Sequence, residues 1–127
     1  RTLSGRESLY AQSAVINAAK AAGKQALASV FSDVRDDAGL QATAEDARAL
    51  GFDGMGRIHP RQIAVIHTAF APTEAEIAYA RLLVRAYEEA VAAGRGVVAL
   101  GSKMIDPPVV QRALRTLRWI GERDELD

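Results

Sequence analysis

The sequence contains no cysteine, which excludes disulfide bonds, thiolate zinc sites and cysteine nucleophiles. It also has no excess of basic charge, because 16 lysines and arginines are balanced by 16 aspartates and glutamates. A nucleic-acid partner held by counterion release needs a basic face, so this balance argues against that class of function. No apolar run is long enough to span a bilayer and no signal-peptide pattern opens the chain, so we expect a cytoplasmic protein with no membrane partner.

The rest of the composition is that of an ordinary globular protein. The chain has 127 residues, of which 49% are hydrophobic and 25% are charged, and this suits one domain with a modest core. Its two histidines, His59 and His67, do not have the spacing of metal ligands. The sequence therefore predicts no metal site built from histidines.

The first part of the chain carries the pattern of a strand, a helix and a second strand. The apolar run 26–31 predicts a strand buried on both faces, and 54–58 predicts a second, shorter strand. Between them we expect a helix that Asp36 or Asp37 caps and that ends at Gly51. Strand, helix and strand over about thirty residues form a βαβ unit with parallel strands.

Two more helices are predicted around this unit. Ser4 and Glu7 have the spacing of a capping box, which predicts a helix that ends at Gly23. Pro60 suits the first turn of a helix after the second strand, because proline is pre-organised for that position.

A long helix opens the second part of the chain. Thr73 and Glu76 form another capping box, and Gly94 supplies the left-handed stop. The apolar stripe predicted for the inner face of this helix is Ile77, Ala80, Val84, Tyr87 and Val91.

A small hairpin and a last helix are predicted to follow. The hairpin is expected to turn near Gly101, and Asp106 is expected to cap the helix, with Pro107 in its first position. The break in pattern near Pro72 predicts two domains, 1–72 and 73–127.

Glycines at 51, 54 and 56 fall within six positions, and Ile-His-Pro follows after Arg57. A glycine cluster in a strand marks a place where something approaches the backbone closely. The spacing is not GxGxxG and the cluster does not lie between a strand and its helix, so it is not a phosphate loop. We expect these glycines to let the strand bend while a ligand lies close to it.

Two parallel strands do not suffice for a domain, because each leaves an unpaired edge and parallel sheets are covered on both faces. A (β/α)8 barrel typically takes about 250 residues, of which this chain would supply about a quarter. We therefore expect the chain to be the C-terminal part of a longer polypeptide.

Four motifs in order resemble the citrate lyase beta subunit and malyl-CoA lyase family of the HpcH/HpaI aldolase superfamily. GFDGMGRIHPRQ (51–62) is similar to the last-strand motif of that family. FAP (70–72) with the helix that follows is similar to its Phe-x-Pro segment, and GSKMIDPPV (101–109) to its Gly-Lys-Met-Ile-Asp signature. VFSDVRD (30–36) is similar to the preceding strand. The resemblance runs from about Ser8 to Ile120.

The resemblance implies an α/β fold, the C-terminal part of a (β/α)8 (TIM) barrel. Residues 1–72 would be its last two parallel strands, and 73–127 a helical C-terminal extension. Family members make or break a carbon–carbon bond between a thioester enolate and a 2-oxo acid, with Mg2+ polarising the oxygen. The metal ligands and a substrate-binding arginine lie on earlier strands of the family, so this chain alone is expected to be inactive.

The resemblance also assigns site residues. In relatives the extension packs on a neighbouring subunit of a homo-oligomer, a trimer or hexamer, and lends it the aspartate that moves a proton at the enolate carbon; that position is Asp106. As a helix cap the same side chain would be held in one orientation. The residues expected to bind the acyl-CoA or acyl-carrier thioester are Gly54, Ile58, His59, Pro60, Lys103 and Met104.

Some positions depart from the family pattern or have a plainer explanation. Met55 stands where relatives usually carry lysine, which removes a positive charge near the barrel mouth. Leu-Gly-Ser (100–102) replaces a commoner Asp-Gly in the hairpin. Lys103 and Arg57 could contact CoA phosphates or simply be solvated charges, and His67 is expected at the surface of its helix.

Two other functions remain open at this point. One is a non-enzymatic helical assembly module that retains a packing surface without the chemistry. The other is a metal-dependent aldolase that acts on free acids, against which the Met-Ile-Asp extension argues. The sequence does not identify the acyl group or the 2-oxo acid.

Overall fold

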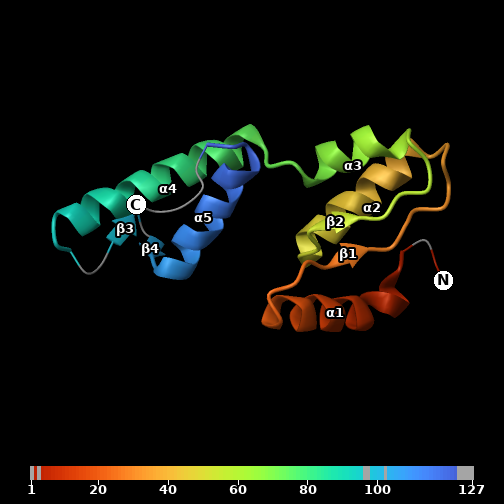
Figure 1. Cartoon of the computed structure of the whole chain (residues 1–127), viewed down its shortest axis with the longest axis horizontal. Coiled ribbons are helices and arrows are strands. Elements are labelled where there is room, and N and C mark those ends of the chain that lie inside the picture. The colour runs from red at the N-terminus through yellow and green to blue at the C-terminus, as the bar shows by residue number, and fades with distance from the viewer. Residues whose placement is uncertain (1, 3, 96–97, 102, 123–127) are drawn as a thin grey trace. The chain divides into compact units, whose positions relative to one another are not determined.

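The computed structural model describes the chain except for residues 1, 3, 96–97, 102 and 123–127. It divides into two compact units, Arg1–Ala71 and Pro72–Asp127. Figure 1 labels the helices and strands of both units. Each unit has a hydrophobic core of its own.

The first unit is built on a parallel βαβ arrangement. Its strands pair in parallel, with Leu27 opposite Gly54 and Ala28 opposite Met55, so the predicted βαβ unit is confirmed. The helix between the strands begins after the Asp36 cap, whose carboxylate accepts from the Gly39 N–H at 2.8 Å. The elements are η1 (Arg6–Ser8), α1 (Leu9–Ala21), β1 (Leu27–Ala28), α2 (Asp37–Leu50), β2 (Gly54–Met55) and α3 (Gln62–Phe70).

The start of the chain differs from the prediction. Gly5 has a φ of 60° and turns the chain out of helical geometry between Ser4 and Arg6, so Ser4 does not occupy a helix cap. The Glu7 carboxylate instead accepts from the Thr2 backbone N–H and hydroxyl, each at 2.7 Å. The predicted Ser4–Glu7 capping box is therefore wrong.

The strands are shorter and less covered than the sequence suggested. Each is two residues long, where 26–31 and 54–58 were expected. Ala26 and Ala28 are buried, whereas the Leu27 side chain is 65% exposed and Val30 is also exposed. Side chains alternate between the faces of a strand, and no described element covers the face that carries Leu27. The prediction of burial on both faces is wrong for this chain.

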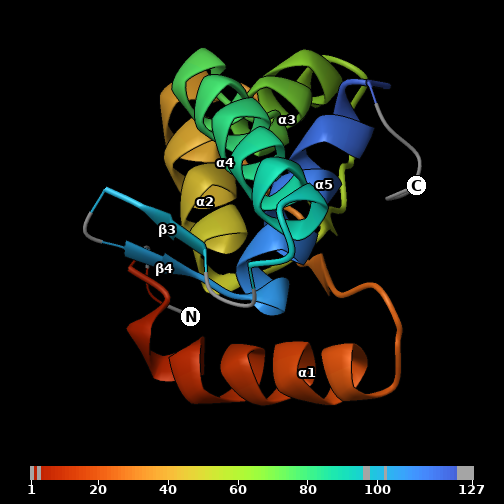
Figure 2. The same cartoon turned by 90° about the vertical axis from the view of Figure 1, so that its left-hand side faces the viewer.

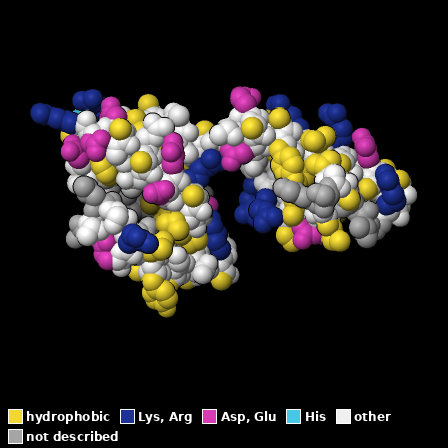
Figure 3. Space-filling view, turned by 180° about the vertical axis from the view of Figure 1, so that it is seen from behind, with side chains coloured by type: hydrophobic (Ala, Val, Ile, Leu, Met, Phe, Trp, Pro, Cys, Tyr) yellow, Lys and Arg dark blue, Asp and Glu magenta, His cyan; other side chains and the backbone are white. Residues whose placement is uncertain are grey.

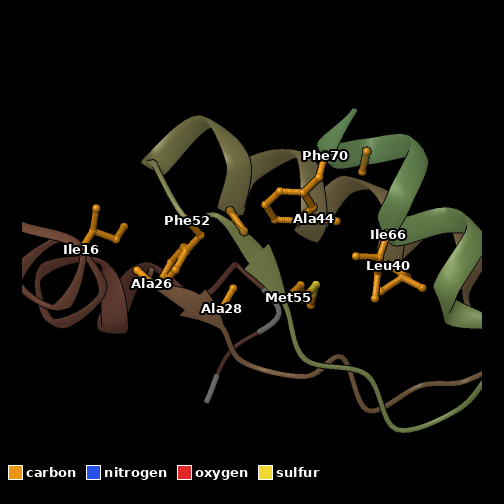
Figure 4. Close-up of a cluster of buried hydrophobic side chains, with 11 residues drawn as sticks. Ile16, Ala26, Ala28, Leu40, Ala44, Phe52, Met55, Ile66 and Phe70 are labelled. Atoms are coloured by element: carbon orange, nitrogen blue, oxygen red, sulfur yellow. The ribbon is translucent and has the colours of Figure 1, made fainter. Parts of the chain in front are cut away.

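The core of the first unit lies where the helices meet the inner face of the strands. Figure 4 shows Met55 of β2 beside Leu40 of α2 and Ile66 of α3, and Phe52 between Ile16 and the strands. Figure 1 shows α2 and α3 lying along the β2 side of the strand pair, with α1 beyond β1. The helices thus hold the carboxyl ends of the two strands in a fixed position relative to α3.

The second unit is a helix pair with a hairpin. Its elements are α4 (Glu74–Ala92), β3 (Val98–Leu100), β4 (Lys103–Ile105) and α5 (Pro107–Trp119). The capping box of Thr73 and Glu76 is confirmed by reciprocal hydrogen bonds of 3.2 and 2.7 Å. The antiparallel hairpin turns at Gly101, which has a φ of 59°. Figures 1 and 2 both show α5 lying against α4.

The core of this unit joins α4, α5 and the hairpin. Its most deeply buried side chains are Leu83, Leu114 and Val110. The predicted stripe on α4 is confirmed at Ile77, Ala80 and Val84, but Val91 is 56% exposed and Leu83 and Ala90 belong to the core instead. Figure 3 shows hydrophobic side chains at the surface of both units, interspersed with charged ones. None of the helices that the structure describes is long and apolar enough to cross a membrane.

Candidate functional site

The turn that follows β2 is held by a buried amide. Among the described residues, Gln62 is the one polar or charged side chain that is buried, with 1% of its surface exposed. Its Nε2 donates to the Phe31 carbonyl at 2.9 Å, and its Oε1 accepts from the Ile58 N–H at 3.0 Å. Phe31 comes three residues after the end of β1 and Ile58 three residues after the end of β2. Gln62 therefore ties together the segments that leave the carboxyl ends of both strands.

His59 sits at the centre of this turn. Its carbonyl accepts from the Gln62 backbone N–H at 3.1 Å, and its Nδ1 accepts from the Arg61 backbone N–H at 3.1 Å. Because Nδ1 acts as an acceptor, the proton of the neutral ring is on Nε2. The exposed His59 ring thus presents an N–H donor to a ligand.

The glycines of β2 make room for the neighbouring strand. A Cβ placed on Gly54 would lie 3.2 Å from Leu27 Cδ2, and one on Gly56 would lie 3.0 Å from Val30 Cγ1. Gly51 has a different role, since it ends α2 with a φ of 110°. The close approach expected from the glycine cluster is therefore made by side chains of the β1 segment.

Met55 faces the opposite way from Gly54. It is 9% exposed and belongs to the hydrophobic core with Leu40 and Ile66. Because successive residues of a strand point to opposite faces, this side chain lies on the helix-covered side. The expectation that Met55, in place of the usual lysine, removes a positive charge near a barrel mouth stays a prediction.

Asp106 is both exposed and held in place. Its Oδ1 accepts from the Val109 N–H at 3.0 Å, and its carbonyl accepts from the Val110 N–H at 3.2 Å, so it caps α5 as predicted. Its Oδ2 makes no hydrogen bond to any residue that the structure describes. One carboxylate oxygen is thus fixed by the helix, while the other is held by none of the described residues.

Met104 lies beside a hollow in the second unit. The hollow has a volume of about 340 Å³ and lies between α4, β4 and α5, with Tyr79 and Arg112 among its lining residues. The Met104 side chain is 72% exposed. The backbone of Lys103 pairs with Leu100 in the hairpin, but its side chain lies outside the described part of the chain.

The predicted binding residues fall into two groups. The first unit brings Gly54, Ile58, His59 and Pro60 into one strand end and its turn, and Pro60 lies in the turn before α3 rather than within that helix. The second unit brings Met104 and Asp106 to the junction of β4 and α5. His67 is exposed on α3, as expected.

No three histidines, aspartates or glutamates within the described ranges come together as a group that could hold a metal ion. The residues present therefore do not fit a Mg2+ site of the ordinary kind, which needs carboxylate oxygens.

Gln62 is a residue that sequence reasoning missed. It begins a stripe with Ile66 and Phe70, both of which are buried, at the four-residue spacing of one helix face. A polar side chain within an otherwise apolar stripe is the signal that could have identified it, because buried polar groups are retained where they are hydrogen-bonded.

Comparison with known proteins gives concordant results. Residues 1–60 match the family described as HpcH/HpaI aldolase/citrate lyase. The chain is 44% identical over 113 residues to citrate lyase subunit beta of Escherichia coli, covering 89% of this chain and 37% of that protein. It is 41% identical over 105 residues to the mitochondrial citramalyl-CoA lyase of Mus musculus, covering 83% of this chain and 31% of that protein.

A solved structure is also similar. The CitE protein of Mycobacterium tuberculosis, in complex with magnesium, acetoacetate and coenzyme A, superposes with a TM-score of 0.72 at 39% identity. The similarity covers 89% of this chain and 41% of that one, so the chain spans well under half the length of the relatives it matches. The sequence motifs and these comparisons agree: the chain belongs to the HpcH/HpaI aldolase/citrate lyase family.

Proposed function

We propose that this chain supplies the last two β/α units of a (β/α)8 barrel and the C-terminal helical extension of a Mg2+-dependent carbon–carbon lyase. Residues 1–72 would form the barrel part and 73–127 the extension. The substrate would be an acyl-CoA or acyl-carrier thioester of a 3-hydroxy acid. The observation that carries the proposal is the turn at His59, because active sites of such barrels gather at the carboxyl ends of the strands.

The proposed reaction is a retro-aldol cleavage. The substrate hydroxyl loses its proton to a base as the bond between the hydroxyl carbon and the carbon next to the thioester breaks. The products of that step are a 2-oxo acid and a thioester enolate, which then takes a proton at carbon. His59 would donate a hydrogen bond from Nε2–H to an oxygen of the thioester substrate, where negative charge develops; the engagement of Nδ1 by the Arg61 N–H supports this role.

Asp106 is proposed to move the proton at the enolate carbon. The hydrogen bonding of the carboxylate supports this role, because the helix holds Oδ1 and none of the described residues bonds to Oδ2. The extension would bring the residue to the active site of a neighbouring subunit in a homo-oligomer. Exposed apolar side chains on the second unit, among them Leu82, Val91 and Trp119, support such packing.

Mg2+ would polarise the substrate oxygen, and its ligands would come from strands outside this chain. The described residues form no such site, so no step assigned here to His59 or Asp106 depends on a metal ligand from this chain.

The alternative is a non-enzymatic assembly module. Two features favour it: the exposed side chains of Leu27 on β1 and of Val30 just after β1, and the apolar side chains at the surface of the second unit. Both are suited to contacts with other chains. This alternative predicts a stable complex that has no dependence on Mg2+ or CoA.

The deciding experiment starts from the natural protein that carries this chain. Its intact mass is measured first, and a mass near twice that of the 13.6 kDa chain is expected if the metal-binding strands are present. Release of the 2-oxo acid from citramalyl-CoA and malyl-CoA is then followed with and without Mg2+. A mass near 13.6 kDa, or no Mg2+-dependent cleavage of either thioester, would contradict the proposed function and leave the assembly module.

A further inference from the structure

We propose that Gln62 is a positioning residue for the lyase reaction: its buried amide sets the orientation in which His59 meets the thioester substrate. The inference rests on the proposed function, in which the His59 turn lines the substrate site. Gln62 itself is 1% exposed, so it acts through its neighbours and does not contact the substrate.

The side-chain amide continues the strand pairing beyond the point where the ladder ends. The last backbone bond of the pair is from the Gly56 N–H to the Ala28 carbonyl at 3.0 Å. Phe31 lies three residues after Ala28, and Ile58 lies three residues after Met55, so the two keep the register of the last paired residues. The Gln62 amide bridges them by donating to the Phe31 carbonyl and accepting from the Ile58 N–H.

Gln62 also brackets His59 from both sides. Its side chain holds the residue before His59, through the Ile58 N–H, and its backbone N–H binds the His59 carbonyl. The Arg61 N–H completes the arrangement at Nδ1. The turn therefore has one preferred backbone geometry, and with it one tautomer of the His59 ring. The Ile58 N–H is already engaged by Gln62, and His59 Nε2 is a donor that this turn can offer to a ligand.

A neutral amide suits this position because it supplies one donor and one acceptor where the turn offers one of each. A glutamate would keep the acceptor but, when ionised, would face the Phe31 carbonyl with a second acceptor. A methionine of similar shape would remove the partner of both backbone groups, which lie in a partly buried setting, and that loss is costly. The turn would then relax to other geometries and His59 would lose its fixed orientation.

The test is a double-mutant cycle in the natural protein that carries this chain. The substrate is citramalyl-CoA with Mg2+, and the variants are Gln62→Met, His59→Phe and the two combined. Gln41→Met is the matched control, because the Gln41 amide donates to Glu45 on the exposed face of α2. We expect Gln62→Met to lower kcat/KM by about tenfold to a hundredfold, the scale of a misplaced contact, and Gln41→Met to leave it unchanged.

The decisive result is the kcat/KM of the variant that combines Gln62→Met with His59→Phe. If Gln62 acts through His59, adding Gln62→Met to His59→Phe causes no further loss of kcat/KM. Independent losses that multiply would overturn the inference while leaving the proposed function standing. Absence of cleavage by the unmodified protein would overturn the proposed function and the inference with it.

If the Gln62→Met protein does not fold, the same cycle is run with Gln62→Glu, which keeps the Ile58 contact. We then expect a smaller loss of kcat/KM that again vanishes in the His59→Phe background. A Gln62→Glu protein that is as active as the unmodified one would refute the inference.

Discussion

Asp106 has two roles that substitution can separate, because the structure assigns them to different oxygens. Oδ1 caps α5 through the Val109 N–H, and Oδ2, which bonds to none of the described residues, is the oxygen proposed to transfer the proton. Asparagine caps a helix about as well as aspartate, whereas alanine does not cap at all. Asp106→Asn therefore removes the proposed chemistry and keeps the cap, and Asp106→Ala removes both.

The expected magnitudes follow from these contacts. Loss of an N-cap costs about 1 kcal/mol, and loss of a positioned acid or base lowers the rate by about 10²–10⁴-fold. For a unit as small as Pro72–Asp127, about 1 kcal/mol corresponds to a fall in Tm of about 4–8 °C. Thermal unfolding of the 127-residue chain measures the cap, and 2-oxo acid release from citramalyl-CoA by the natural protein measures the chemistry.

Asp106→Asn is expected to keep the Tm of the unmodified chain and to lose nearly all turnover. Asp106→Ala is expected to lose both. Turnover by Asp106→Asn at the unmodified rate would show that Asp106 is a cap and nothing more. Equal melting temperatures for the asparagine and alanine variants would refute the reasoning about the cap.

Three further predictions concern stability and are checked by thermal or denaturant unfolding. Gly54→Val brings a branched side chain against Leu27 Cδ2 and is expected to lower stability by less than the about 1–3 kcal/mol of an overpacked core, because the exposed Leu27 side chain can move aside; Leu27→Ala should recover the loss, and a loss unchanged by Leu27→Ala would contradict the close approach of the two residues. Leu83→Ala empties a site that is 1% exposed and should cost about 2–5 kcal/mol, and a change within the error of measurement would argue against the α4–α5 core. The hydrogen bond and charge of Arg81 lower the pKa of Glu122 below its ordinary 4.5, so the pair stabilises the fold above that pH and the contribution is lost as the pH falls through the lowered pKa. Glu122→Gln should remove this part of the pH dependence, and an unchanged acid profile would show that the pair contributes nothing.

The features that the sequence predicted best depend on contacts between residues close in the chain. The Thr73–Glu76 capping box, the Asp36 and Asp106 caps and the glycine stop at Gly51 are all confirmed. Each requires hydrogen bonds or backbone angles within one turn of helix, so the local sequence suffices. The parallel pairing of β1 and β2 was also predicted, since a strand, a helix and a strand at this spacing have few other arrangements.

The features that the sequence did not predict depend on what surrounds them. Ser4 and Glu7 have the spacing of a capping box, but Gly5 adopts a left-handed conformation that directs the chain elsewhere. The apolar run at 26–31 looks buried throughout, yet the exposure of Leu27 follows from the absence of a described element over its face. Met55 was expected near the site, and the alternation of strand faces places it in the core.

The sequence by itself indicated the family, through four motifs in one order along the chain, and it determined most of the helix ends, through their caps and stops. Only the tertiary structure decided how the site is held. Gln62 reaches Phe31 across 31 positions of the chain, and that contact exists because α2 and α3 pack beside the strand pair and bring the two strand ends together. A hydrogen bond between distant segments depends on the packing of everything between them, which no local pattern specifies.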